Sequence, residues 1–486
     1  MTEHTLAQQL AGFAAGTSYD DLPVDVVQSV KMRVLDTLGI ATAAASLETS
    51  RAAREWARRQ GVAEQGTGTS GIGVAQPLPA AQAAFVNGVL AHSLDYDDTH
   101  LPSVLHPSAS VVPTALAAAE RIGADGRAVI RAIAVGLEVC VRIGMAGYDR
   151  KAGNSTFFEH GQHATSICGA MGASVAAALL DGADEKRIVD TLGVAASMAS
   201  GIIEANRTGG TVKRIHCGWA AHAAISAAEL VGLGLTGPPT VLEGRFGFFQ
   251  AWLHGTFDAS EITDGLGTRW SVPDIFFKPY PANHFTHAAV DAAAALREQG
   301  VGIDEIETLV LGVPEQNKRT VGEPIEVKRT PDTGYMAQFS GPYAVALGLL
   351  GGTGLGAGLD DYTDELAHDR RRREIMAKVD VVADERCTEI FPLQFPAVLT
   401  ARLTGGRDVV TEVLTTRGGP ARPLSFDELT AKFRDNALRA LTEDEADQLA
   451  ATCRRLDECA DLRGLMAPLT GVDAPTPARR DEPNTY

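Results

Sequence analysis

The chain has 486 residues, and its 43 basic and 61 acidic side chains give a formal net charge of −18. This charge argues against nucleic acid and anionic membranes as partners, because both attract basic protein surfaces. Hydrophobic residues make up 45% of the sequence and charged residues 21%, which is typical of a globular protein and excludes a mainly disordered one.

The six cysteines include no CxxC pair. Such a pattern indicates a reduced, cytoplasmic protein rather than a disulfide framework or a structural zinc site. The first residues are polar and have a helical pattern, with no basic segment leading into an apolar one, so we expect no signal peptide. The most apolar stretch, residues 167–180, is shorter than the roughly 20 residues that cross a bilayer. We therefore expect a soluble protein without a membrane partner.

Alanine and glycine dominate the first 270 residues, in runs where small and aliphatic side chains recur at helical spacing. Short turns that contain glycine and aspartate separate these runs. So many small residues on helices predict that the helix axes pack closely. The expected helices cover residues 79–94, 109–122, 126–146, 163–181, 186–202 and 218–232.

The pattern changes near residue 270. Residues rich in valine, isoleucine and leucine predict strands at 306–313 and 376–383, and residues 397–416 predict a hairpin that turns at Gly405-Gly406-Arg407. Helices predicted at 284–299 and 338–351 interleave with these strands, which indicates a compact α+β unit.

The helical pattern returns after about residue 424. Ser425 is the expected N-cap of a helix at 426–441, which a second helix at 442–459 follows. We therefore predict a mainly α protein with a large all-helical domain built from both chain ends and an inserted, smaller α+β lid domain. The expected bounds are 1–270 and 410–475 for the helical domain, 271–409 for the lid and 476–486 for a flexible tail.

The densest cluster of polar residues follows the helix predicted at 79–94. Carboxylates and imidazoles this close together could transfer protons, although they could equally be turn residues at a helix end. We expect no metal site here, because neither an HxH pair nor HExxH spacing occurs. The cluster reads His92-Ser-Leu-Asp95-Tyr-Asp97-Asp98-Thr99-His100 and continues at His106-Pro-Ser.

Two further motifs stand at predicted helix starts. His163 begins an apolar helix, whose positive dipole end would lower the pKa of an imidazole and favour an anionic ligand. Lys213 and Arg214 precede a helix of small residues, an arrangement suited to holding carboxylates. The alternatives are an ordinary helix start at His163 and a solvated basic turn at Lys213.

The fourth motif is a proline-stiffened loop that leads into a helix. Its His284 and His287 would need a third ligand to hold a metal, and the sequence locates none, so we expect no metal there. A glycine-rich run at 352–356 follows a helix rather than a strand and so fails the test for a dinucleotide site. We expect no cofactor. The loop reads Lys278-Pro-Tyr280-Pro-Ala-Asn283-His284-Phe-Thr-His287.

These motifs, in this order, resemble the MmgE/PrpD family over about residues 5–470. The resemblance implies an all-helical domain from both termini, an α+β lid, a homodimer and a metal-free site between the domains. Family members include dehydratases, decarboxylases and epimerases of small polycarboxylates. The resemblance also implies the residues that line the site, namely Asp95, Thr99, His106, His163, Lys213 and Lys278.

One position departs from the family pattern. The residue after Pro281-Ala282 is a histidine in the family's decarboxylase and often a cysteine elsewhere, but here it is Asn283. Asparagine cannot relay a proton at neutral pH, which disfavours decarboxylation and leaves the adjacent His284 as a possible substitute.

The resemblance implies a lyase reaction that begins with removal of a proton next to a carboxylate. Lys213 and Lys278 would stabilise the resulting enolate, and Thr99 would donate a hydrogen bond. His163 and His106 would serve as acid and base in an order left open, with Asp95 orienting one of them.

The expected substrate is a small di- or tricarboxylate, and the expected reaction is dehydration of a 2-methylcitrate-like hydroxy acid. Two alternatives remain. One is epimerisation, isomerisation or a cis-aconitate-like decarboxylation of a related polycarboxylate, and the other is a non-catalytic carboxylate-binding protein.

Overall fold

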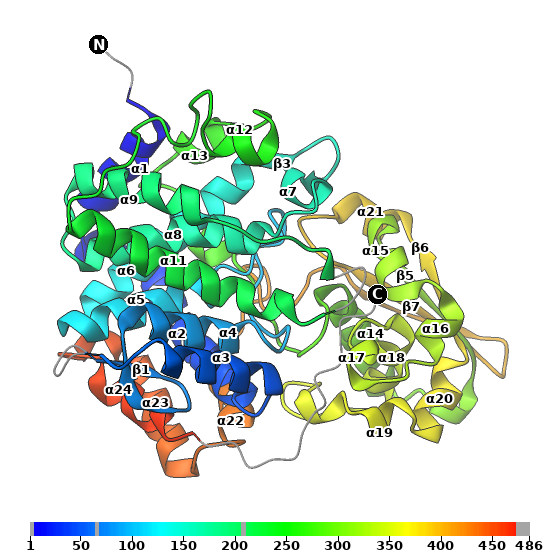
Figure 1. Cartoon of the computed structure of the whole chain (residues 1–486). Coiled ribbons are helices and arrows are strands. Elements are labelled where there is room, and N and C mark those ends of the chain that lie inside the picture. Colours follow the sequence, from blue (N-terminus) through cyan, green and yellow to red (C-terminus); the bar gives the residue numbers. More distant parts are fainter. Residues whose placement is uncertain (1–3, 64–67, 206–209, 473–486) are drawn as a thin grey trace. The chain divides into compact units, whose positions relative to one another are not determined.

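The computed structural model describes residues 4–63, 68–205 and 210–472. It is mainly helical, as predicted from the sequence (Figure 1). The chain forms two compact units, of which the first comprises Met1–Ile275 with Asn436–Tyr486 and the second Phe276–Asp435. The expected tail at 476–486 lies outside the described residues.

Helix α8 (Ala164–Leu180) is the centre of the first unit, and every one of its residues is buried. It packs against α5 (Ser108–Ile122), α6 (Gly126–Ala146), α9 (Glu185–Met198) and α11 (His216–Gly232). The close packing expected from the small residues is present: a Cβ added at Gly172 of α8 would lie 2.3 Å from the carbonyl oxygen of Gly136 on α6. Helices α5, α8 and α11 begin directly after the segments that carry the site residues described below.

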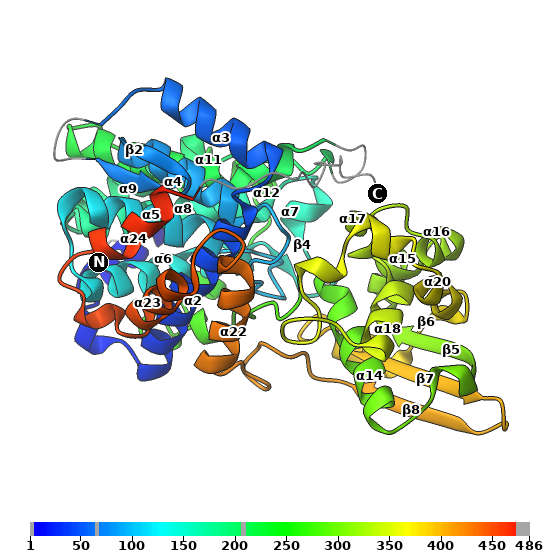
Figure 2. The same ribbon diagram turned by 90° about the horizontal axis from the view of Figure 1, so that it is seen from below.

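Other helices of the first unit surround this group (Figures 1 and 2). They are α1 (Leu6–Gly16), α2 (Val24–Ala44), α3 (Glu48–Arg59), α4 (Ala80–Ala91), α7 (Thr156–Glu159), α12 (Phe248–Leu253), α13 (Ser260–Thr263), α23 (Glu443–Arg454) and α24 (Arg463–Thr470), with 3-10 turns η1 (Tyr19–Asp21), η2 (Val212–Ile215), η3 (Val272–Asp274) and η7 (Leu456–Glu458).

The first unit is helical as expected, apart from two short hairpins that the sequence did not predict. β1 (Thr69–Gly71) pairs antiparallel with β2 (Val74–Leu78), and β3 (Tyr148–Asp149) pairs with β4 (Asn154–Ser155). The first hairpin turns at Gly73, which has a φ of 70°. Strands of two to five residues are too short to show a clear alternation of polar and apolar residues, so the pattern did not predict them.

The second unit is built on a four-stranded sheet in the order β6-β5-β7-β8. β5 (Ile306–Val313) pairs parallel with β6 (Val379–Ala383) and antiparallel with β7 (Ala397–Leu403), which pairs antiparallel with β8 (Asp408–Val413). Leu309 and Leu311 of β5 are buried in one core with four alanines of α14 (His287–Glu298). Helix α14 contacts β7, β8 and α18 (Gly341–Leu350).

This unit extends further than the expected bound at residue 409. A boundary there would cut β8, whose six residues pair with β7 along their whole length. The unit also includes most of α22 (Phe426–Ala437). Its remaining elements are η4 (His284–Thr286), η5 (Ile303–Glu305), α15 (Glu315–Gly322), α16 (Ile325–Arg329), α17 (Gly334–Ala337), η6 (Leu359–Asp361), α19 (Asp364–Ala367), α20 (Arg370–Met376) and α21 (Glu385–Ile390).

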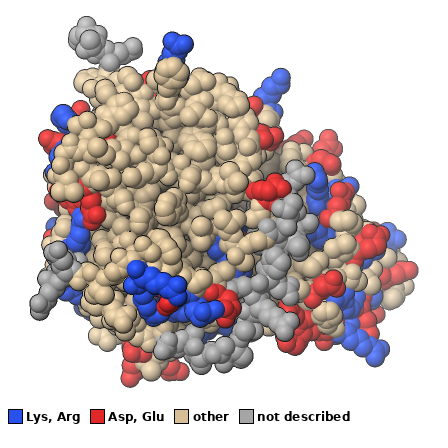
Figure 3. Space-filling model, in the orientation of Figure 1, with Lys and Arg blue, Asp and Glu red and all other residues tan. Residues whose placement is uncertain are grey.

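Three further features concern the helices, the cysteines and the surface of the protein. Within the described ranges, none of the helices combines the length and the apolar composition needed to cross a membrane. All six cysteines are free thiols. Charged side chains are sparse on the face of the first unit that Figure 3 shows over α8, α9 and α11.

Candidate active site

The loop between α4 and α5 carries the first group of predicted site residues. Asp95 and Val104 adopt left-handed backbone conformations, with φ of 52° and 53°. Such conformations raise the energy of residues other than glycine, most of all that of a β-branched valine. They persist only where contacts with the surrounding structure hold the backbone in place.

The contacts of Asp98 hold this loop in place. Its carboxylate lies 2.7 Å from the guanidinium of Arg33 on α2, and it accepts hydrogen bonds from the backbone and hydroxyl of Ser108 at the start of α5. Arg33 in turn donates to the carbonyls of Val272 and Ile275. Both charged side chains are buried. Asp98 therefore anchors the loop, and its pairing with Arg33 could not be predicted from the spacing of the motif.

The same loop fixes the tautomer of His106. Its Nδ1 lies 2.6 Å from the carbonyl oxygen of Asp98 and 3.3 Å from Oγ1 of Thr99. Because a carbonyl only accepts, Nδ1 carries the hydrogen and the lone pair of the neutral ring is on Nε2. The backbone N–H of His106 donates to Oγ1 of Thr165 at 3.2 Å, so Thr165 positions His106 rather than merely starting α8.

His163 forms a second histidine pair. It immediately precedes α8, and its Nδ1 lies 2.9 Å from Nδ1 of His216, the first residue of α11. Burial, and then the neighbouring His216, lower the pKa of His163 well below its usual value of 6.5. Burial, and then His92, lower the pKa of His216 to about 4. Both rings are therefore neutral at pH 7.

His92 completes the cluster. Its ring centroid is 5.6 Å from that of His106 and 5.5 Å from that of His163. Its Nδ1 lies 2.6 Å from Oδ2 of the buried Asp97, which orients the ring. Sequence reasoning did not place His92 or His216 among the site residues. The available signal was their position inside the same motifs, five residues before Asp97 and three after Lys213.

Lys213 brings positive charge to this cluster. Its Nζ lies 3.7 Å from Oδ1 of Asp95, and both side chains stay partly exposed. Its charge helps to lower the pKa values of His163 and His216. The first unit thus brings together five predicted residues: Asp95, Thr99, His106, His163 and Lys213. Among the residues that the structure describes, no group of three or more His, Cys, Asp or Glu is placed to hold a metal ion.

The other three predicted residues, Lys278, Asn283 and His284, belong to the second unit, where they lie in the loop that leads into η4 and at its first residue. Lys278 is buried there. Oδ1 of Asn283 accepts from the backbone of Phe285 and so caps η4, which gives this asparagine a structural role. The ring of His284 is buried and packs edge-on against Phe276 and Phe395.

Comparison with known proteins identifies the family of this chain. The model of the MmgE/PrpD N-terminal domain matches residues 8–260, and that of the MmgE/PrpD C-terminal domain matches residues 280–458. The chain belongs to the MmgE/PrpD family. The resemblance inferred from the sequence motifs is therefore confirmed.

Relatives of this MmgE/PrpD chain include two mammalian proteins that match it over nearly their full lengths. Human cis-aconitate decarboxylase is 29% identical over 97% of this chain and 96% of its own, and the mouse protein is 28% identical over 96% and 94%. The mitochondrial 2-methylcitrate dehydratase of Yarrowia lipolytica is 27% identical over 34% of this chain and 31% of its own. These relatives are lyases, and the chain is an enzyme of the lyase class, as predicted.

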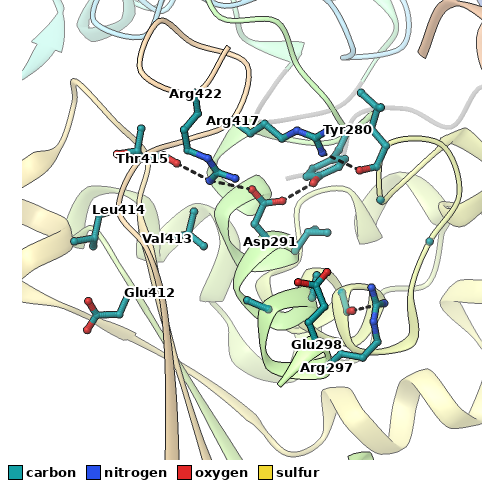
Figure 4. Close-up of a pocket in the computed structure, with 17 residues that line it drawn as sticks. Tyr280, Asp291, Arg297, Glu298, Glu412, Val413, Leu414, Thr415, Arg417 and Arg422 are labelled. Atoms are coloured by element: carbon teal, nitrogen blue, oxygen red, sulfur yellow. Dashed lines mark hydrogen bonds and ion pairs between the residues drawn. The ribbon is translucent and has the colours of Figure 1, made fainter. Parts of the chain in front are cut away.

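The MmgE/PrpD chain also has a cavity in its second unit (Figure 4). Its volume is about 680 Å³, and three acidic and three basic side chains line it. Arg422 lies 3.5 Å from Asp291, whose carboxylate accepts from the hydroxyl of Tyr280, and Arg417 pairs with Glu428 at 2.7 Å. Of the predicted site residues, none lines this cavity.

Proposed function

We propose that this MmgE/PrpD lyase removes a proton next to a carboxylate of a small di- or tricarboxylate, and that its reaction is dehydration of a 2-methylcitrate-like hydroxy acid. The observation that carries the proposal is the neutral His163–His216 pair beside the positive charge of Lys213. A neutral imidazole next to a cation is suited to taking a proton from carbon while the negative charge develops nearby.

His163 is the base in this proposal. Its lowered pKa keeps the ring unprotonated at neutral pH, so a nitrogen lone pair is available. Lys213 would bind the substrate carboxylate whose enolate forms, because an ammonium placed before the reaction costs no reorganisation when charge develops. Asp95, 3.7 Å away, would position that ammonium.

His106 is the acid. With its Nδ1 hydrogen committed to the carbonyl of Asp98, any second proton resides on Nε2, where it can be given to the departing hydroxide. Thr99 would donate a hydrogen bond to substrate, and Lys278 and His284 are further candidates for binding carboxylates. A homodimer, a cytoplasmic location and independence of metals and cofactors are also part of this proposal and rest on the family resemblance and the composition.

A second candidate is decarboxylation of an unsaturated tricarboxylate such as cis-aconitate. Its support is that the relatives matching over nearly their whole lengths are cis-aconitate decarboxylases. Loss of carbon dioxide would leave a carbanion that His106 could protonate. Asn283, which cannot relay a proton and whose Oδ1 caps η4, favours the dehydratase.

Product analysis separates these reactions. The purified protein is incubated with 2-methylcitrate and, separately, with cis-aconitate, and the products are identified by chromatography and mass spectrometry. We expect an alkene that has lost water and kept every carbon. Release of carbon dioxide with formation of itaconate would replace dehydration by decarboxylation. Binding of these compounds without any product would contradict both and indicate a carboxylate-binding protein.

A further inference from the structure

The hydrogen bond between His163 and His216 joins two side chains that are both buried and both basic. Their Nδ1 atoms are 2.9 Å apart, so one of the two atoms carries the hydrogen and the other accepts it. We propose that His216 is a positioning residue that accepts the Nδ1 proton of His163 and passes the proton removed from substrate out to solvent. This inference rests on the proposed role of His163 as the base.

Hydrogen bonds hold the main chain of both histidines in place. The N–H of His163 donates to the carbonyl of Gly201 at 3.0 Å, and the carbonyl of His216 accepts from the hydroxyl of Ser166 at 3.0 Å. Because α8 and α11 also pack directly on each other, the distance between the rings is set by the fold. The two histidines therefore remain in contact whichever nitrogen carries the hydrogen.

The pair differs from the neighbouring His92, which is held by the carboxylate of Asp97. Within the described part of the chain, neither His163 nor His216 has a carboxylate as hydrogen-bond partner. An imidazolium at His163 is thus not held by an adjacent negative charge and tends to give its proton up. Both residues are buried, and His216 is slightly the more exposed, at 6% against 2%, so the proposed transfer runs from the more buried ring to the less buried one.

The proton steps balance as follows. The electron pair of the broken C–H bond stays on the substrate as an enolate, and the proton goes to Nε2 of His163. The Nδ1 proton of His163 moves to Nδ1 of His216, and the Nε2 proton of His216 goes to water. Both rings are then neutral again with exchanged tautomers. After product leaves, His163 gives its Nε2 proton to water, the Nδ1 proton of His216 returns to Nδ1 of His163, and His216 takes up a proton from water at Nε2, which restores the starting arrangement.

Replacing His216 by asparagine removes the proton relay but keeps the hydrogen bond that orients the ring of His163. The amide oxygen of His216→Asn falls near the former Nδ1 and can still accept the hydrogen of His163, but the amide cannot carry a proton onward. His222→Asn is the matched control, because His222 lies on the same helix with its ring stacked on Trp219, away from the cluster.

The reaction is run in D₂O with the substrate that the wild-type enzyme converts, and proton NMR follows both product and deuterium in the remaining substrate. In the wild type and in His222→Asn the removed proton exchanges with solvent, so deuterium accumulates in unreacted substrate. In His216→Asn we expect the ratio of deuterium uptake to product formation to fall at least about tenfold. If His216→Asn does not fold, as judged by circular dichroism, His216→Gln is measured with the same expectation.

If the ratio of deuterium uptake to product formation in His216→Asn equals that of the wild type, the proton relay is overturned while the proposed lyase reaction stands. A wild-type protein that neither converts nor exchanges any carboxylate would instead overturn the proposed function, and the relay with it.

Discussion

His106 and His163 differ in what holds their Nδ1 atoms. A backbone carbonyl holds that of His106, which gives this ring one tautomer, whereas a second imidazole holds that of His163, which allows two. The fixed ring is suited to delivering a proton from one defined atom. The adaptable ring is suited to taking a proton and losing it again.

Replacement of His163 tests its role as the base. We expect His163→Ala to lower kcat by well over about 100-fold, because general-base catalysis contributes at least that much. The measurement is steady-state turnover of the variant on the substrate of the wild type. His160→Ala is the control, since His160 is exposed and stacks on His254. A loss of only a few-fold in His163→Ala would remove the residue from this role.

The sequence motifs predicted most of the residues in this cluster, but not their pairing. His163 and His216 are 53 residues apart, and only the packing of α8 on α11 brings them into hydrogen-bond distance. The structural role of Asn283 could not be predicted either. Its side-chain chemistry shows that it cannot relay a proton, but only the structure shows that its Oδ1 caps η4. Local spacing identifies candidate groups, and tertiary contacts decide their partners.

At the scale of elements, the loop between α4 and α5 depends on the Asp98–Arg33 pair. Removing one partner leaves the other charge buried and uncompensated, so we expect Asp98→Asn to lower the free energy of unfolding by about 3 kcal/mol or more. Urea unfolding at pH 7.5 measures the change.

The matched control makes the same substitution at an exposed pair. Asp408 pairs with Arg402 in the hairpin of the second unit, where both side chains remain half exposed. Asp408→Asn should cost under about 1 kcal/mol. Equal costs at the two sites would show that Asp98 does not anchor the loop as described.

Sequence periodicity predicted α5 and α6 well, because they are rich in small residues and bounded by turn residues, but it did not predict α2, which is as long as α6. It placed the second boundary too early, at residue 409, which lies inside the hairpin that the same pattern predicts at 397–416. The pairing of β8 with β7 assigns both strands of that hairpin to the second unit.

For the molecule as a whole, buried neutral histidines predict sensitivity to acid. Burial, and then Arg33, lower the pKa of His100 in the first unit to about 4, from 6.5 when unfolded. Below pH 6.5 the unfolded chain binds a proton that the folded chain does not bind until about pH 4, so stability falls as the pH falls through this range. His216, with a folded pKa also of about 4, acts in the same direction.

Urea unfolding at pH 7.5 and 5.0 tests this prediction. His100 alone should account for a loss of about 2 kcal/mol of unfolding free energy between the two pH values. In His100→Asn, whose amide can keep the bond to the hydroxyl of Ser103, that loss should be absent. The surface variant His368→Asn should lose as much stability as the wild type. An identical loss in His100→Asn would contradict the assignment.

The most direct test of the central claim is proton NMR of the protein in D₂O with a panel of di- and tricarboxylates that includes 2-methylcitrate, citrate and cis-aconitate. We predict that the C–H signal next to a carboxylate of at least one compound disappears with the wild type and persists with His163→Ala. No loss of signal for any compound, or an equal loss with both proteins, would contradict proton abstraction by the histidine cluster.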